Sequence, residues 1–273
     1  MKRLIKIEFR KLYRHRAYWF MTVAYTVILA IMIFGIPELI DYIAEKTGER
    51  TTTRIFKAVV FNFPDVWQNI AFVAGMRYFI KIILGIIIII LITNEFNYQT
   101  IRLNVVNGLS RGGFLGAKVI TVAGMTLFST VVIFLSGLYL GLVHSVHTSP
   151  ADIFGKTVFL GAYFVETFTF LLFCMLIGFV FRKMGVAFIV LFVYMIIEPI
   201  FDYKLPDAAS PYLPLNAMNR LVQSPNTSLI KVSSSEFPFE FQERIALADT
   251  AICLLYAALF ISICFLIIRK RDL

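Results

Sequence analysis

The sequence predicts an all-α membrane protein with six transmembrane helices, and three observations lead to that prediction. Of the 273 residues, 59% are hydrophobic and only 16% are charged, whereas a soluble domain has about 25% charged residues. Apolar runs of about 20 residues, the length that crosses a bilayer, recur along the chain. Lys and Arg gather in alternate connections between these runs. We therefore expect a single transmembrane domain over residues 1–273.

The N-terminal 16 residues are strongly basic but also carry a periodic apolar pattern. Leu4, Ile5, Phe9 and Leu12 recur at helical spacing among seven Lys and Arg residues. This pattern predicts an amphipathic helix over residues 1–16 that lies on the inner membrane surface. A merely basic flank before the first span is the alternative.

The apolar runs define the spans and the loops between them. Six segments are long enough: about 17–36, 71–93, 115–143, 157–181, 185–200 and 247–268. The first helix is expected to continue outward until "KTGERTTT" breaks it. The fifth segment is short and ends at Glu198-Pro199. Five prolines and the stretch "SPYLPLNAMNRLVQ" predict short helices in the loop before the last span.

The distribution of charge sets the expected orientation. The two termini and the connections after the second and fourth spans together carry 15 basic residues and three acids. The two long loops, 37–70 and 201–246, carry eight basic residues and ten acids. Under the positive-inside rule the first set is cytoplasmic, so both termini lie inside. The net charge of +9 is thus a topology signal and a contact for lipid headgroups, and we expect no nucleic-acid partner.

A polar stretch, "NEFNYQTIRLNVVNGLSRGG", interrupts the apolar pattern between the second and third spans. Tyr98, Ile101 and Val105 form one apolar stripe in it, so a short helix there would expose apolar side chains. Such a helix favours a groove in a partner or in its own chain. A loop that rests on lipid headgroups is the alternative.

The polar pattern of this stretch resembles the cytoplasmic loop of ABC-2 type transporter permeases. The resemblance rests on Glu95, Thr100-Ile101-Arg102, Gly108, Ser110-Arg111 and Lys118. In that family an acid, Gly-Thr-x-Arg and then Ser-Arg precede a Lys; Gln99 stands here where glycine is common. The basic N-terminus, the six spans and the long loop before the last span are similar as well.

This resemblance implies the membrane subunit of an ABC exporter in a prokaryotic inner membrane. It implies a coupling helix over residues 95–110 in a groove of a separate ATPase subunit, and a dimer of permeases, or of one permease and a sister, above two ATPase subunits. The residues assigned to ATPase coupling, from this resemblance and the apolar stripe, are Glu95, Tyr98, Thr100, Ile101, Arg102, Val105, Ser110 and Arg111.

No cofactor is expected on the chain itself. It contains no G-x-x-x-x-G-K-[ST] sequence, so ATP and Mg²⁺ are expected on the partner ATPase, and catalysis by the chain alone is not expected. Membrane lipids are the remaining expected partner.

Charged residues inside the predicted spans are costly and raise a functional question. They are Arg77, Lys81, Glu166, Glu198 and Asp249. They form a candidate polar path for a charged or amphiphilic cargo; the alternative is that they pair with one another or reach the headgroups.

Other functions need features that the sequence does not favour. A membrane-embedded enzyme would need convergent catalytic groups, and an ion-coupled carrier using Glu166 would often show two inverted halves. His144, His147 and Asp152 give a weak metal pattern, and we expect no metal there. Cys174, Cys253 and Cys264 lie in apolar runs and are interpreted as small buried side chains.

Overall fold

The computed structural model describes residues 8, 10–14, 16–48, 57, 60–75, 79–98, 100, 110–145, 147–206, 208–225 and 242–270. All regular structure within these residues is helical, which confirms the all-α part of the predicted fold class. The long helices are α2 (Arg16–Thr47), α5 (Lys81–Asn97), α7 (Arg111–His144), α9 (Val158–Phe181), α10 (Met184–Lys204) and α12 (Leu247–Lys270). The short ones are α4 (Val66–Gly75), α8 (Pro150–Phe154), η2 (Ser210–Tyr212), α11 (Pro214–Asn219) and η3 (Arg220–Val222).

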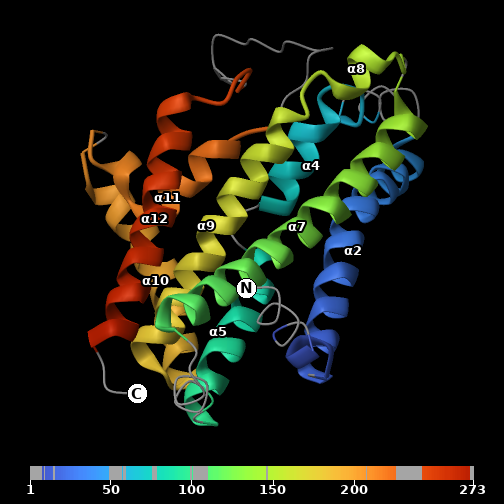
Figure 1. Cartoon of the computed structure of the whole chain (residues 1–273). Coiled ribbons are helices and arrows are strands. Elements are labelled where there is room, and N and C mark those ends of the chain that lie inside the picture. The colour runs from blue at the N-terminus through green and yellow to red at the C-terminus, as the bar shows by residue number, and fades with distance from the viewer. Residues whose placement is uncertain are drawn as a thin grey trace.

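Five stretches of the described chain are long and apolar enough to cross a membrane. They contain α2, α7, α9, α10 and α12, and they correspond to the predicted first, third, fourth, fifth and sixth spans. In Figure 1 the start of α2 and the ends of α5 and α12 lie at one end of the molecule, and α8 lies at the other. The chain is therefore a multi-pass helical bundle.

The predicted second span, 71–93, is wrong as one continuous helix. The chain forms α4 and then α5, and Phe79 and Ile80 lie in a turn between them. Gly75 ends α4, and Lys81 begins α5 with its charged side chain fully buried. Apolar content alone predicts burial here, and it does not reveal that the helix is interrupted.

Two helices run through a proline and are longer than the predicted spans. α2 passes Pro37 and ends at Thr47, as the expected outward extension requires. α10 passes Pro199 and ends at Lys204, so the end predicted at Glu198-Pro199 is too early. A proline removes one backbone donor from a helix, yet both helices continue past their proline.

α9 is the central helix of the bundle. It packs against α4, α5, α7, α10 and α12, and most of its side chains are buried. Its sequence is apolar on every side, which is typical of a helix surrounded by other helices. α2 and α10 are far less buried.

α4 is fixed to α7 by aromatic rings that lie over two glycines. The Trp67 ring stacks on Phe134 with 5.3 Å between ring centroids, and the Trp67 Nε1 donates to the Ile153 carbonyl at 2.5 Å. A Cβ added at Gly137 would lie 2.8 Å from Trp67, and one added at Gly141 would lie 2.2 Å from Phe63. The two glycines therefore provide the space that these rings occupy.

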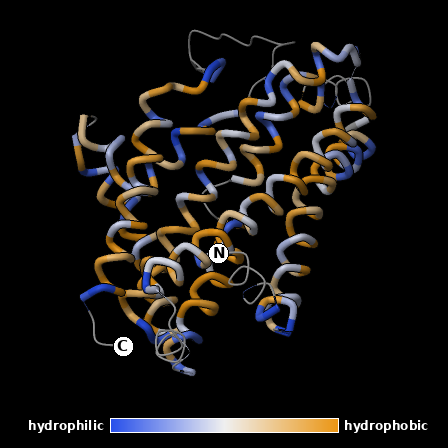
Figure 2. The backbone as a smooth tube through the Cα atoms, viewed as in Figure 1, coloured by the Kyte–Doolittle hydropathy of each residue, from blue (hydrophilic) through white to orange (hydrophobic). Residues whose placement is uncertain are grey.

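The outer surface of the bundle is apolar. Figure 2 shows hydrophobic colour prevailing along the long helices, and large exposed side chains include Phe20, Ile31, Leu135, Ile189 and Leu255. A protein surrounded by water rarely exposes so much contiguous apolar surface. The surface is suited to contact with lipid.

The predicted short helices before the last span are present as η2, α11 and η3. At the other end of the chain, residues 10–14 are helical and precede α2. Most of the predicted amphipathic helix 1–16 lies outside the described residues.

Candidate functional site

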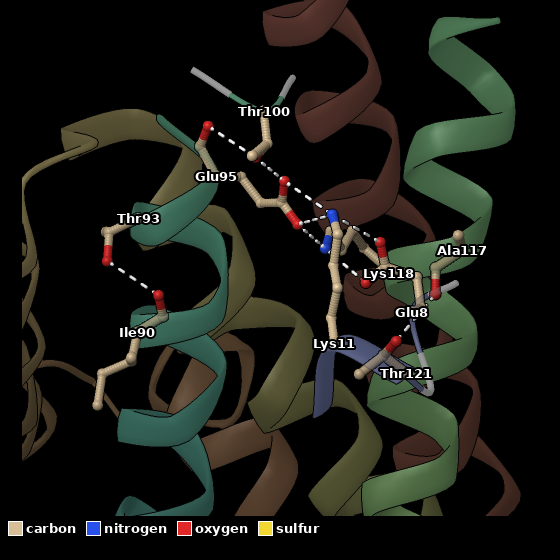
Figure 3. A network of polar contacts seen from close by, with 9 residues as sticks. All are labelled: Glu8, Lys11, Ile90, Thr93, Glu95, Thr100, Ala117, Lys118 and Thr121. Carbon is tan, nitrogen blue, oxygen red and sulfur yellow. Dashed lines mark hydrogen bonds and ion pairs between the residues drawn. The ribbon is translucent and has the colours of Figure 1, made fainter. Parts of the chain in front are cut away.

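Five polar residues from three parts of the chain meet where α5 ends and α7 begins. We call them the Glu95 cluster: Glu8, Lys11, Glu95, Thr100 and Lys118. Glu8 and Lys11 belong to the segment before α2, Glu95 to the last turn of α5, and Lys118 to the second turn of α7. Figure 3 shows their charged ends pointing toward one another.

Lys118 joins the two carboxylates of the cluster. Its Nζ lies 2.5 Å from Glu95 Oε1 and 2.6 Å from Glu8 Oε2. The side chains of Lys118 and Glu95 are only 5% and 6% exposed. Lys11 completes the cluster at 3.0 Å from Glu95 Oε1, and its side chain is 38% exposed. Two lysines thus balance two glutamates, with Lys118 inside and Lys11 at the rim.

The charge of Glu95 is favoured despite its burial. Desolvation by itself raises the pKa of the Glu95 carboxyl. Lys118, the Thr100 hydroxyl and Lys11 together lower it by more than desolvation raises it, so the pKa lies below its ordinary value. Thr100 Oγ1 donates to both the Glu95 carboxylate and the Glu95 backbone carbonyl. A buried ion pair stabilises a fold only when such hydrogen bonds complete it.

Thr100 is one of the predicted coupling residues that the structure brings to Glu95. Ser110 instead caps α7, where its Oγ accepts a hydrogen bond from the Gly113 backbone N–H at 3.1 Å. Tyr98 is the C-cap residue of α5 and is 72% exposed. The predicted residues Ile101, Arg102 and Val105 lie outside the described residues.

Arg111 lies against the end of the last helix. Its guanidinium donates to the backbone carbonyls of Ile268, at 3.2 Å, and Arg269. The last carbonyls of a helix lack partners within the helix, and a basic side chain commonly supplies them. Arg111 therefore ties the start of α7 to the end of α12, next to the predicted coupling loop.

Glu8 and Lys11 were not among the predicted site residues. Glu8 is the only acid among the first 16 residues and lies three residues before Lys11. A single acid in a basic segment is a weak indication that it forms an ion pair with a particular basic side chain. Its partner Lys118 is 110 residues away, a separation that helical periodicity does not reveal.

A second charged pair lies inside the bundle. The Lys81 Nζ is 2.5 Å from Glu166 Oε1, and the two side chains are 0% and 2% exposed. Glu166 Oε2 is buried and has no hydrogen-bond partner among the residues that the structure describes. Lys81 begins α5, where the helix dipole disfavours a cation, and the adjacent carboxylate offsets that cost.

A chain of hydroxyl groups continues from this pair. The Lys81 Nζ lies 5.5 Å from the centroid of the Tyr163 ring. The Tyr163 hydroxyl is 2.8 Å from Ser129 Oγ, which is 2.5 Å from the Tyr25 hydroxyl. Polar groups from α2, α5, α7 and α9 thus meet in the interior.

The remaining predicted path residues have other partners. Glu198 accepts a hydrogen bond from the Asn216 backbone N–H at 2.8 Å, and Asp249 pairs with Arg220 at 3.0 Å. Arg77 lies outside the described residues. The structure therefore brings Lys81 and Glu166 together and gives Glu198 and Asp249 separate partners, α11 for the first and η3 for the second.

Metal ligands are not gathered in the described part of the chain. It holds no group of three or more His, Cys, Asp or Glu side chains that could bind a metal ion. The His144 ring contacts the Leu140 carbonyl through Nδ1 at 3.1 Å, and Asp152 accepts from Ser149 at 2.6 Å.

A family model described as ABC-2 family transporter protein matches residues 4–198 of this sequence. The chain belongs to the ABC-2 transporter family. No curated protein matches it. The match covers both the Glu95 cluster and the Lys81–Glu166 pair, so both sites lie in the part of the chain that the family model matches.

Family membership confirms the expected class of protein. ABC-2 family proteins are generally non-catalytic membrane subunits of transporters, and they generally pair with ATPase subunits. The multi-pass bundle agrees with that class. Neither a membrane-embedded enzyme nor an ion-coupled carrier is favoured.

Proposed function

We propose that this ABC-2 family protein is the translocation subunit of an ABC exporter and is driven by a separate ATPase through the segment 95–110. ATP and Mg²⁺ bind to that ATPase, and the chain itself binds neither. The transporter lies in the prokaryotic cytoplasmic membrane with both termini of this chain in the cytoplasm. A second copy or a sister permease completes it.

The Glu95 cluster is the observation that carries this proposal. Glu95 lies at the base of the predicted coupling segment and is bound to α7 through Lys118 and to the N-terminal segment through Lys11. Arg111 holds the other base of the segment against α12. Both ends of the segment are therefore attached to long helices.

This attachment gives the segment a mechanical role. Packed helices move as rigid bodies, and a small displacement at an interface can shift a whole helix. When the ATPase closes on ATP, a pull on the segment displaces α5, α7 and α12 together. Because α5 and α7 both pack against the central α9, the motion reaches the interior pair of Lys81 and Glu166.

The test is co-purification of the full-length protein with an ABC ATPase from its native membrane. We expect Arg102→Glu to weaken ATPase binding, since a reversed charge in the coupling segment repels an acidic groove that accepts an arginine. Lys204→Glu is the matched control, because Lys204 is an exposed lysine at the end of α10. Equal ATPase recovery with both variants would contradict the proposal.

A further inference from the structure

The break between α4 and α5 lies beside a hollow. The hollow has a volume of about 600 Å³. Phe72, Phe79 and Val222 provide apolar lining, whereas Asn216, Asn219 and Gln223 provide amide groups. Arg220 also lines it, and its charge is balanced by Asp249 at 3.0 Å.

Gly75 separates this hollow from the Lys81–Glu166 pair. It lines the hollow, and a Cβ added to it would lie 3.5 Å from Glu166 Oε2 and 3.6 Å from Lys81 Nζ. The absence of a side chain at this one position leaves the charged pair next to the hollow.

Glu166 Oε2 is the unsatisfied group in this arrangement. It is buried, Lys81 is paired with the other oxygen of the carboxylate, and it accepts no hydrogen bond within the described residues. Buried acceptors in folded proteins nearly always have a partner. A hydrogen-bond donor on a ligand in the hollow would satisfy this carboxylate oxygen.

We infer that the hollow is the cargo site of the proposed exporter, and that its ligand is an amphiphile with an uncharged head group rich in hydroxyl or amide groups. Among the described residues, each charge in or beside the hollow has a partner of opposite charge: Lys81 pairs with Glu166, and Arg220 pairs with Asp249. An uncharged head group suits such a lining. The amides of Asn216, Asn219 and Gln223 can both donate and accept, which suits hydroxyl and amide groups. One donor of the head group reaches Glu166 Oε2 past Gly75.

The apolar part of the ligand has a place as well. Phe79 is 75% exposed at the rim of the hollow, and the surrounding helix surfaces are apolar. An alkyl chain that leaves the hollow beside Phe79 would therefore remain in contact with apolar side chains or lipid. The assignment of the ligand as transported cargo rests on the proposed function, whereas the binding of the ligand in the hollow does not.

Binding can be tested with octyl glucoside that carries a photoreactive diazirine in its alkyl chain. The full-length protein in lipid nanodiscs is illuminated with this probe, and labelled peptides are mapped by mass spectrometry. We expect labels near Phe79 and in residues 214–223 that excess octyl glucoside removes and octyl sulfate does not.

Two variants and one control make the test specific. Gly75→Leu fills the space in front of Glu166, and Asn219→Leu removes an amide of the lining. Gly75→Leu should reduce labelling about tenfold, the loss expected for one hydrogen bond to a buried charged group, and Asn219→Leu should reduce it about fivefold, because its amide is neutral. Gly161→Leu is the control, because an added Cβ there meets nothing within 4 Å, and it should label like the unmodified protein.

The outcomes separate this inference from the proposed function. Labels that spread over the lipid-facing helices, or that persist in both Gly75→Leu and Asn219→Leu, would overturn the cargo site. ATPase co-purification is measured on the same samples: if the unmodified protein captures no ATPase but is labelled at the hollow, the coupling proposal fails and the binding site stands.

Discussion

At the scale of the residue, the Glu95 cluster shows how charges become useful in an apolar chain. An isolated buried charge costs several kcal/mol in solvation, so Lys118 is tolerated only because Glu95 and Glu8 both lie within 2.6 Å of its Nζ. Lys11 makes the same kind of contact from a partly solvated position. The two lysines therefore differ in burial while sharing a carboxylate.

Replacing Lys118 with Met should lower the stability of the protein by about 3–5 kcal/mol, because two buried carboxylates lose their shared partner. Lys11→Met is the matched control and should cost about 1 kcal/mol or less, since an exposed pair contributes little. Thermal unfolding of both variants in the same detergent measures the difference. Similar midpoints for the two would show that burial does not distinguish these lysines.

At the scale of the element, the helices most fully predicted from sequence are those with uninterrupted apolar runs. The fourth span, predicted as 157–181, is α9, Val158–Phe181. The second span, predicted as one helix, is interrupted between Gly75 and Lys81, in a run that also contains Arg77. Lys81, the first residue of α5, pairs with the Glu166 carboxylate of α9, and a local sequence pattern does not contain such a partner.

The contact between α4 and α7 offers a test of packing against helix propensity. Ala is favoured over Gly inside a helix by about 1 kcal/mol, yet the added methyl group at Gly141 would lie 2.2 Å from the Phe63 ring. Phe63 is held by Trp67, 5.7 Å away between ring centroids, and by its backbone bond to Ser145 Oγ at 2.8 Å. We therefore expect Gly141→Ala to destabilise the protein by about 1–3 kcal/mol.

Gly161→Ala is the control for this comparison, because nothing lies within 4 Å of its added Cβ. It should leave the unfolding midpoint unchanged or raise it slightly, in line with propensity alone. Thermal unfolding of the two variants decides the matter, and a midpoint that rises for Gly141→Ala would mean that the ring yields at little cost.

At the scale of the whole molecule, composition and charge were enough to predict a multi-pass membrane protein. They did not predict the contacts between residues that are distant in the sequence. The long helices and the short helices before α12 follow from apolar runs and prolines. The coupling residues were assigned by resemblance, and the structure adds Glu8 and Lys11, whose positions depend on how three separate segments pack. Charge pairing in the interior likewise depends on the arrangement of α5 and α9.

The orientation of the bundle is a prediction for the molecule as a whole. The termini should face the cytoplasm, and the end of α10 should face outward. In intact cells an impermeant maleimide should therefore label Lys204→Cys, and it should label Lys270→Cys only after the membrane is opened. The unmodified chain is the control, because Cys174, Cys253 and Cys264 are all buried. The reverse pattern of labelling would invert the proposed topology.

The two tryptophans of this chain are in opposite surroundings: Trp67 is fully buried against α7, whereas Trp19 is 46% exposed. Changing Trp19 to Phe would leave one indole whose emission depends on the seam between α4 and α7. Loosening of that seam during a transport cycle would admit water to the ring and shift its fluorescence to longer wavelengths, so the protein contains an optical reporter at the helix that precedes the break.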